Sequence, residues 1–177
     1  MKPIINLADA PAQEQAHGDH FANRMTQLAG PIGGTAIGAN VTRVPPGKAA
    51  FPFHHHYANE EHFFILGGTG TLRLGTASHP VKANDYIVNL PGGPETAHQL
   101  INTGTEDLVY LAISTKITPE VGGYPDSAKS GVMLAPRGSP PPPFMVMLAD
   151  QKDPTHYWDG EDGHTVAATV ATATGAS

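Results

Sequence analysis

The chain has 177 residues, of which 40% are hydrophobic and 15% charged, and its formal net charge is -6 at pH 7. This length suits one domain with its own core, and the lack of clustered Lys and Arg excludes a general nucleic-acid binder. The absence of cysteine excludes disulfides, thiolate metal sites and a cysteine nucleophile. The N-terminus lacks the apolar core of a signal peptide and no run approaches transmembrane length, so we expect a cytoplasmic protein without membrane association.

The first part of the chain is polar and rich in glycine, and the pattern changes at residue 35. We interpret residues 1–34 as an N-terminal extension that packs on the main domain, with one short helix near residues 12–30. From residue 35 onward apolar and polar residues alternate, which indicates strands with one buried face. Strands are predicted at residues 35–44, 61–66, 70–75, 79–83, 85–90, 97–102 and 107–115. So many short strands, separated by Gly and Pro, indicate an antiparallel barrel or sandwich.

Connecting segments are predicted between and after these strands. The sequence GGTG at residues 67–70 predicts a hairpin turn. Asn84 and Asp85 predict the centre of a tight turn, because both residue types tolerate unusual backbone angles. Residues 117–164 predict irregular loops and one short strand that pack on the barrel, and the small residues of 165–177 predict a flexible tail.

Three consecutive histidines lie in an aromatic and aliphatic stretch just before the second predicted strand. If they belong to a strand, His54 and His56 share one face and His55 points the other way. Glu61, on the strand that returns after a turn, can then meet His54 and His56 across a hairpin. His98 is a further candidate that arrives from a distant strand.

Three imidazoles and one carboxylate form a ligand set for one divalent transition metal ion: Fe, Mn, Ni, Co, Cu or Zn. They suit Ca and Mg poorly, because those ions prefer oxygen ligands. Four protein ligands on an octahedral ion leave two positions for water, substrate or dioxygen. The alternative is a solvated, histidine-rich turn without a ligand. The complete set favours the metal site, since burying these side chains without a partner costs several kcal/mol.

The same residues resemble the motifs of a known family. The segment "PGKAAFPFHHHYANEEHFFILGGTG" resembles the first motif of the cupin superfamily, with Pro46, Gly47, His54, His56, Glu61 and Gly68 at its positions. The segment "PGGPETAHQLIN" resembles the second motif, with Pro91, Gly93, His98 and Asn102. The spacing to Gly68 favours Glu61 over the adjacent Glu60 as the acidic ligand.

The resemblance covers residues 35–116 and implies a single-domain bacterial cupin. Its fold would be all-β, an antiparallel double-stranded β-helix, also called a jelly roll or cupin barrel. The implied metal ligands are His54, His56, Glu61 and His98. No catalytic residue beyond the metal ligands is assigned.

Residues near the two motifs are candidates for a substrate pocket: Phe51, Phe63, Ile65, Arg73, Gln99 and Tyr110. The apolar ones either line a cavity, together with Phe53, or belong only to the core. Arg73 binds a substrate carboxylate or phosphate if its strand face looks inward; otherwise it is a solvent-exposed arginine. Residues 124–131 and 156–162 resemble segments of other bacterial single-domain cupins, and the first is interpreted either as a lid or as a surface loop that packs on a neighbouring subunit.

The resemblance implies a homodimer that binds a small organic molecule. A histidine-rich site with open metal positions favours a dioxygenase-type oxidoreductase. Two alternatives remain open: a sugar-phosphate isomerase-like or lyase cupin, and a non-catalytic cupin that binds a sugar or metabolite. An inward-facing Arg73 favours an anionic ligand, whereas an apolar cavity favours an aromatic or diketone-like substrate.

Overall fold

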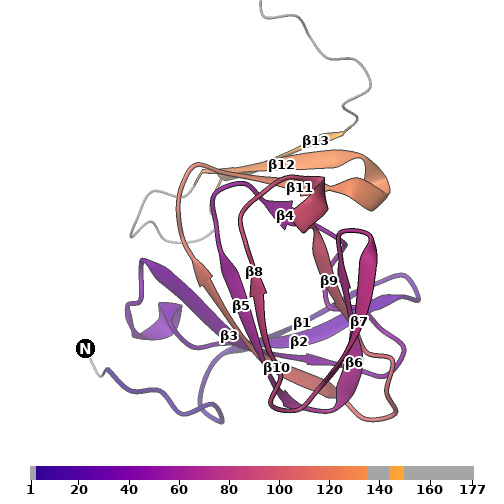
Figure 1. Ribbon diagram of the computed structural model, residues 1–177. Coiled ribbons are helices and arrows are strands. Elements are labelled where there is room, and N and C mark those ends of the chain that lie inside the picture. Colours follow the sequence, from indigo (N-terminus) through magenta and orange to yellow (C-terminus); the bar gives the residue numbers. More distant parts are fainter. Residues whose placement is uncertain (1–2, 135–143, 150–177) are drawn as a thin grey trace, which may run out of the picture.

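The computed structural model describes residues 3–134 and 144–149. In this part of the chain, thirteen β-strands are joined by turns and by three single-turn 3-10 helices (Figure 1). No helix among these residues is long and apolar enough to cross a membrane. The predicted all-β fold is confirmed, and the antiparallel sheets are those of a double-stranded β-helix.

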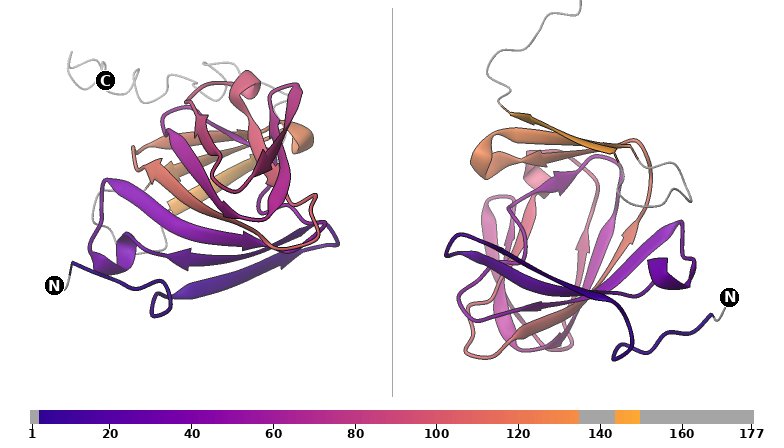
Figure 2. Two further views of the ribbon diagram at one scale, coloured as in Figure 1. Left: turned by 60° about the horizontal axis from the view of Figure 1, so that its bottom comes forward. Right: turned by 180° about the vertical axis from the view of Figure 1, so that it is seen from behind.

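The strands form three sheets (Figures 1 and 2). The six-stranded sheet has the order β1-β2-β3-β10-β5-β8 and consists of β1 (Ala12–His17), β2 (Phe21–Gln27), β3 (Ile37–Val44), β5 (Glu61–Gly67), β8 (Tyr86–Asn89) and β10 (Leu108–Thr115). The three-stranded sheet has the order β7-β6-β9 and consists of β6 (Thr69–Leu74), β7 (Ala77–Lys82) and β9 (His98–Ile101). The four-stranded sheet has the order β13-β12-β11-β4 and consists of β4 (His55–His56), β11 (Glu120–Tyr124), β12 (Lys129–Leu134) and β13 (Phe144–Ala149). The 3-10 helices are η1 (Gly30–Ile32), η2 (Pro94–Thr96) and η3 (Pro125–Ser127).

The core is built by the inward faces of the six-stranded and three-stranded sheets. On β5, Phe63 and Ile65 are buried, whereas Leu66, on the outer side of the same strand, is 46% exposed. One buried cluster joins both sheets: Val44, Ala50, Phe63, Ile65, Leu72, Val81, Ile87, Leu100, Leu108 and Tyr110. Each fully buried large side chain of this kind contributes roughly 1.5–3 kcal/mol, so the alternation along the strands decides which face becomes the core.

The strands predicted from residue 35 onward are confirmed as β3, β5, β6, β7, β8, β9 and β10. The predicted tight turn is also confirmed, because Asn84 has a positive φ of 76°. The Asp85 carboxylate accepts a hydrogen bond of 2.8 Å from the backbone N–H of Lys82 and so closes the turn.

The short helix predicted near residues 12–30 is wrong, because these residues form the hairpin β1–β2 and the turn η1. Strand β2 pairs with β3, so the hairpin extends the barrel sheet at its edge (Figure 2). The buried Asn23 side chain donates a hydrogen bond of 2.7 Å to the carbonyl of Ala50, which ties the hairpin to the barrel. These long-range contacts outweigh the helix propensity of the Gln, Glu and Ala residues in the segment.

The sequence GGTG at 67–70 is not the hairpin turn that was predicted. Strand β5 pairs with β10 and β8, whereas β6 pairs with β7 and β9, so the chain crosses here from one sheet to the other. Gly68 has a φ of 79°, and a Cβ at this position would overlap the backbone of Asp107. Glycine is needed because only it combines this backbone angle with this close approach.

The segment after the barrel is more regular than predicted. Within residues 117–134, expected to be loops, lie β11, η3 and β12. The β11–β12 hairpin covers one end of the barrel and pairs with β4 (Figure 1). Gly123 faces His55 in this pairing, and a Cβ on Gly123 would overlap the His55 ring. The predicted tail at 165–177 and the segment 156–162 lie outside the described residues.

Candidate metal centre

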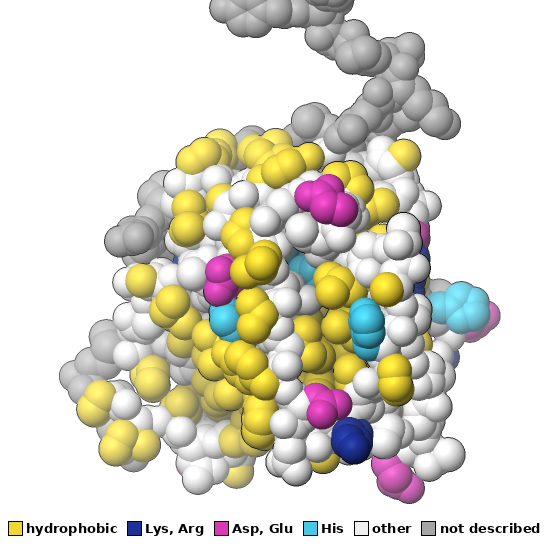
Figure 3. Space-filling view, viewed as in Figure 1, with side chains coloured by type: hydrophobic (Ala, Val, Ile, Leu, Met, Phe, Trp, Pro, Cys, Tyr) yellow, Lys and Arg dark blue, Asp and Glu magenta, His cyan; other side chains and the backbone are white. Residues whose placement is uncertain are grey.

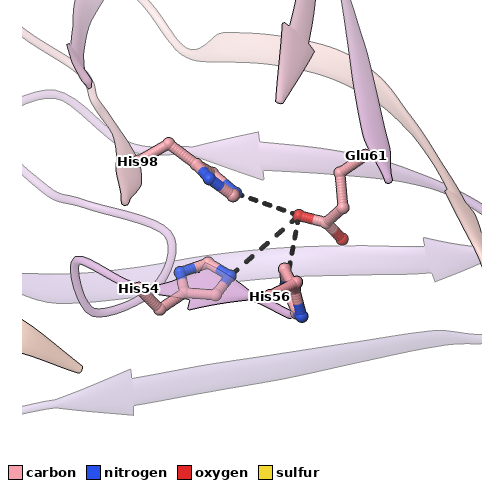
Figure 4. Close-up of side chains that lie close together, drawn as sticks. All are labelled: His54, His56, Glu61 and His98. Atoms are coloured by element: carbon pink, nitrogen blue, oxygen red, sulfur yellow. Dashed lines mark hydrogen bonds and ion pairs between the residues drawn. The ribbon is translucent and has the colours of Figure 1, made fainter. Parts of the chain in front are cut away.

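Four side chains from separate parts of the fold meet under the β11–β12 hairpin (Figure 4). His56 lies on β4, Glu61 begins β5 and His98 begins β9. His54 precedes β4, and its backbone exchanges hydrogen bonds of 3.2 and 2.8 Å with that of His98. These hydrogen bonds hold the segment that carries His54 and His56 beside the segment that carries His98.

The route by which Glu61 reaches the histidines differs from the prediction. Strand β4 pairs with β11 and not with β5, so His56 and Glu61 do not face each other across a hairpin. The side chains meet because β4 and the start of β5 both lie at the end of the barrel that the β11–β12 hairpin covers (Figure 1). Strand β4 itself belongs to the four-stranded sheet, and the chain then passes to β5 in the six-stranded sheet.

The distances within the cluster are those of a shared ligand set. Glu61 Oε2 lies 3.1 Å from His98 Nε2, 3.6 Å from His56 Nε2 and 4.0 Å from His54 Nε2. All four ligand atoms lie within 4.8 Å of one another. Two atoms that each lie about 2.0–2.2 Å from one ion are separated by roughly 3–4 Å. A single cation between them is therefore within reach of all four.

The outer ring nitrogens of the histidines are held by the protein. His54 Nδ1 lies 2.8 Å from the carbonyl oxygen of Pro52, and His98 Nδ1 lies 3.3 Å from that of Thr96. A carbonyl only accepts, so these Nδ1 atoms carry the proton and donate it. Each Nε2 then presents its lone pair to the centre of the cluster, as a metal ligand must.

The electrostatics of the cluster favour neutral histidine and ionised carboxylate. Burial lowers the pKa of His54 to about 4, and the neighbouring His98 adds to this effect. Burial raises the pKa of Glu61, but the close contacts with His56 and His98 outweigh it and hold that pKa well below its usual range. Burial also opposes charge on His56, yet its contacts with Glu61 raise the His56 pKa. A neutral His54 and an ionised Glu61 are the forms that bind a metal.

Both ring nitrogens of His56 are buried and have no hydrogen-bond partner. A buried polar atom without a partner is costly, and coordination through Nε2 would relieve that cost for one of the two atoms. Three imidazoles and a carboxylate also match the ligand preference of Fe, Mn, Ni, Co, Cu and Zn. The four residues therefore fit a divalent transition metal.

The neighbouring residues of the motif point elsewhere. His55 is 3% exposed, and its Nδ1 lies 2.9 Å from the carbonyl oxygen of Gly92, on the side of the strand away from the cluster. Glu60 pairs with His62 at 2.6 Å on the outer side of the barrel. The structure thus places Glu61, and not Glu60, at the cluster.

The aromatic and aliphatic pocket candidates belong to the buried core. Phe63 packs edge-on against His98, with 5.8 Å between ring centroids, and against Tyr110 at 5.2 Å. Phe63, Ile65 and Tyr110 are at most 6% exposed, and Phe51 packs on the same buried cluster. Burial raises the pKa of the Tyr110 phenol, so it stays protonated. These side chains form the floor beneath the cluster.

Arg73 and Gln99 lie on the opposite face of their strands from the cluster. They pair across β6 and β9 and are hydrogen-bonded at 2.9 Å, whereas their neighbours Leu72 and Leu100 point into the core. The Arg73 guanidinium stacks over the buried Phe53 ring at 4.1 Å. The structure does not bring Arg73 and Gln99 to the cluster of His54, His56, Glu61 and His98.

Two residues near the cluster were missed because they belong to the segment expected to be a loop. Glu120 is 2% exposed, and its Oε1 lies 3.7 Å from His56 Nδ1. Tyr124 stacks on His54 with 6.1 Å between ring centroids. In the sequence, both are seen only as an acidic and an aromatic residue in a glycine-rich segment. That pattern does not indicate that they contact His56 and His54.

Known proteins similar to this chain share its fold or part of its sequence. Residues 40–114 match the family model described as Cupin domain. An uncharacterized protein of Methanocaldococcus jannaschii is 30% identical over 114 residues, which cover 64% of this chain and 79% of that protein. An oxalate-binding protein of Thermotoga maritima is 32% identical over 71 residues, which cover 40% of this chain and 55% of that protein.

The fold also resembles solved structures. A sugar phosphate isomerase from a cupin superfamily, from Silicibacter pomeroyi, has a TM-score of 0.72 at 18% identity. The match covers 88% of this chain and 98% of that chain. At this identity the likeness concerns the fold alone.

Proposed function

The chain belongs to the cupin superfamily, and we propose that it is a metal-dependent enzyme acting on a small, oxygen-rich organic molecule. The observation that carries this proposal is the convergence of His54, His56, Glu61 and His98 on one point. The cluster is open to solvent on one side, because the side chains of His54, Glu61 and His56 are 16%, 20% and 21% exposed. A substrate can therefore approach the ligands.

The residues around the cluster have distinct roles in this proposal. A bound divalent metal supplies Lewis-acid chemistry, polarising the oxygen atoms of a substrate. Phe63 and Tyr110 close the site on the side of the core and exclude water there. Burial raises the pKa of Tyr124, whose phenol therefore stays protonated and can donate a hydrogen bond to a substrate oxygen near His54.

Isomerisation of a sugar phosphate is the reaction that we propose first. A protein similar in fold over 88% of this chain is described as a sugar phosphate isomerase. Such a reaction needs a carbonyl and an adjacent hydroxyl oxygen to be held together, which suits four protein ligands and two open positions. The dioxygenase interpretation is supported by the donor set alone, and the similar proteins point elsewhere.

The test uses protein loaded separately with Mn, Fe, Co, Ni or Zn and incubated with aldose and ketose phosphates in D2O. Proton NMR follows both conversion and deuterium exchange at the carbon beside the carbonyl. We expect exchange with at least one metal, and loss of it in His98→Ala. The matched control is His79→Ala, an exposed histidine on β7, which should keep the activity. Absence of both conversion and exchange in every combination would contradict the isomerase proposal, whereas conversion without exchange would indicate a hydride shift.

Binding or cleavage of a small dicarboxylate is the second candidate. It is favoured by the similarity of 71 residues to an oxalate-binding protein, because a dicarboxylate can occupy two open metal positions. Calorimetry with oxalate on the metal-loaded protein separates this case from the first. Tight binding of oxalate with no exchange on sugar phosphates would support a binding protein, whereas oxygen consumption would restore the dioxygenase interpretation.

A further inference from the structure

A row of small and polar residues crosses four strands of the six-stranded sheet at the level of Glu61. In the strand pairing, Gly38 of β3 lies opposite Ser114 of β10, and Ser114 lies opposite Glu61 of β5. Glu61 in turn lies opposite Asn89 of β8. We call these four residues the polar row.

The polar row belongs to the inner wall of the barrel. Side chains alternate along a strand, and Tyr110, four residues before Ser114 on β10, belongs to the core. Tyr110 and Val44 on this wall are at most 2% exposed, whereas Ser114 and Gly38 are partly exposed. On the outer side of β5 and β8, by contrast, hydrophobic side chains gather (Figure 3). The polar row is therefore a part of the inner wall that a substrate can contact.

Lys116 follows β10 on the same inner side. Its backbone N–H donates a hydrogen bond of 2.9 Å to the carbonyl of Ala36, which continues the pairing of β10 with β3 past the ends of both strands. A Cβ on Gly38 would lie 3.2 Å from Lys116 Cε and 3.0 Å from Ser114 Oγ. The Lys116 side chain thus lies over Gly38, and the lack of a side chain at Gly38 provides the room for it.

Lys116 brings a positive charge to a wall that otherwise has none. The inward-facing positions of β3, β5, β8 and β10 contain no Lys or Arg. Lys116 forms no ion pair with any residue of the ranges 3–134 and 144–149. Its ammonium group is a compact charge with three hydrogen-bond donors, so it is available to an anionic group of a ligand.

The spacing between Lys116 and the cluster suits the two ends of a phosphorylated sugar. Neighbouring strands lie about 4.8 Å apart, so Gly38, under the Lys116 side chain, lies roughly 10 Å from Glu61 across β10. A pentose or hexose phosphate carries its phosphate at the opposite end of the carbon chain from the carbonyl group, which is a comparable separation. With the carbonyl oxygen at the cluster, the phosphate reaches Lys116 and the hydroxyl groups between them pass Ser114.

We propose that Lys116 binds the phosphate group of the substrate and makes the protein selective for phosphorylated over neutral sugars. The identity of the anion rests on the proposed isomerase function, whereas the position of the positive charge rests on the contact with Gly38. Because the phosphate takes no part in the reaction at the carbonyl, Lys116 contributes equally to binding of the substrate and of the transition state. Its removal should therefore raise KM and leave kcat nearly unchanged.

Calorimetry on the full, zinc-loaded chain tests this proposal with ribitol 5-phosphate and sorbitol 6-phosphate, which lack a carbonyl group and cannot react. We expect at least one of them to bind more tightly than its unphosphorylated counterpart. Lys116→Met should weaken that binding at least about tenfold, because it removes a charge-assisted hydrogen bond. Gly38→Val keeps the charge but fills the space in which Lys116 Cε lies, so it should also weaken binding of the phosphorylated compound.

The matched control is Lys82→Met, at an exposed lysine on the end of β7 farther from His98, which should bind both compounds as the unchanged protein does. Circular dichroism and bound metal should be unchanged in every variant that is interpreted. The proposal is overturned if no phosphorylated compound binds, if Lys116→Met binds them as tightly as the unchanged protein, or if Lys82→Met weakens binding equally.

The same samples separate this proposal from the isomerase reaction. Isomerisation with a KM that Lys116→Met does not alter would contradict the role of Lys116 alone. Binding of the phosphorylated compounds that is lost in Lys116→Met, without isomerisation of any aldose or ketose phosphate, would support the role of Lys116 and contradict only the reaction.

Discussion

Glu120 is a buried carboxylate whose position is tightly defined. Its Oε1 accepts hydrogen bonds from the backbone N–H groups of Tyr57, at 3.1 Å, and Ala58, at 3.4 Å, and its Oε2 accepts one from the Asn59 side chain. The same Oε1 lies 3.7 Å from His56 Nδ1, the nitrogen that faces away from the cluster. A carboxylate in this place fixes the orientation of an imidazole ligand and increases its basicity.

We therefore expect Glu120→Gln to weaken metal binding by about 10–100-fold without removing a ligand. The matched control is Glu106→Gln, an exposed acid, which should bind metal as the unchanged protein does. Calorimetry gives the affinity, and the electron paramagnetic resonance spectrum of the Cu(II) form reports the altered His56 ligand. An unchanged affinity and spectrum in Glu120→Gln would show that Glu120 only stabilises the surrounding loop.

The ionisation of the cluster also predicts how pH affects the metal-free protein. The pKa of His54 is lowered from 6.5 to about 4 in the folded protein. Between these values the unfolded chain binds a proton that the folded protein does not, so stability is lost as the pH falls. Glu61, with its lowered pKa, adds to the loss at the acidic end. His56, with its raised pKa, opposes the trend because protonation of this group favours the folded state.

We expect the melting temperature of the metal-free protein to fall as the pH is lowered from about 6.5 to about 4. Differential scanning calorimetry in the presence of a chelator measures this directly. In His54→Gln the folded and unfolded states no longer differ in the number of protons bound at this position. The melting temperature should therefore decline less as the pH is lowered. An equally steep decline in that variant would mean that other groups cause the acid sensitivity.

At the scale of the strands, the β11–β12 hairpin is held on the barrel by contacts at both ends. At one end it pairs with β4. At the other, Asp126 in η3 forms a bidentate ion pair with Arg73 of β6, at 2.8 and 3.1 Å. The pair lowers the pKa of Asp126 and raises that of Arg73. Between these attachments lies Tyr124, which covers His54.

Breaking this ion pair should loosen the hairpin locally. The side chains of Arg73 and Asp126 are 33% and 54% exposed, and exposed pairs contribute at most about 1 kcal/mol. We expect Asp126→Asn to increase hydrogen exchange in β11 and β12 while global stability and metal content change little. Asp19→Asn, at an exposed acid near the β1–β2 turn, should not affect exchange there. Unaltered exchange in Asp126→Asn would show that pairing with β4 is sufficient.

For the whole molecule, a metal that binds only the folded state raises stability. At a free metal concentration one hundred times Kd the gain is about 2.7 kcal/mol, or roughly 5–10 °C in melting temperature for a chain of this size. We expect this shift in the unchanged protein and its loss in His98→Ala. His55→Ala should lower the starting melting temperature, because His55 is buried against Gly123, yet keep the shift. A shift that survives His98→Ala would place the metal elsewhere.

Local patterns in the sequence were enough to predict the barrel strands and the four side chains of the cluster. Alternation along β5 separates Phe63 and Ile65, in the core, from Phe64 and Leu66, outside it, since successive side chains point to opposite faces. The four residues of the cluster follow from their spacing within the two segments that resemble cupin motifs. Both the alternation and the motif spacing extend over only a few residues. They therefore do not depend on which strands pair with one another.

The partners of each strand, by contrast, were decided only in three dimensions. Whether β4 pairs with β5 or β11 and whether residues 12–30 form a helix or a hairpin depend on distant contacts. The same is true of the place of Glu120 beside His56 and of Arg73 beside Asp126. These contacts join residues that are far apart in the sequence. Their free energies depend on both partners and on competing pairings, so no single stretch of residues determines them.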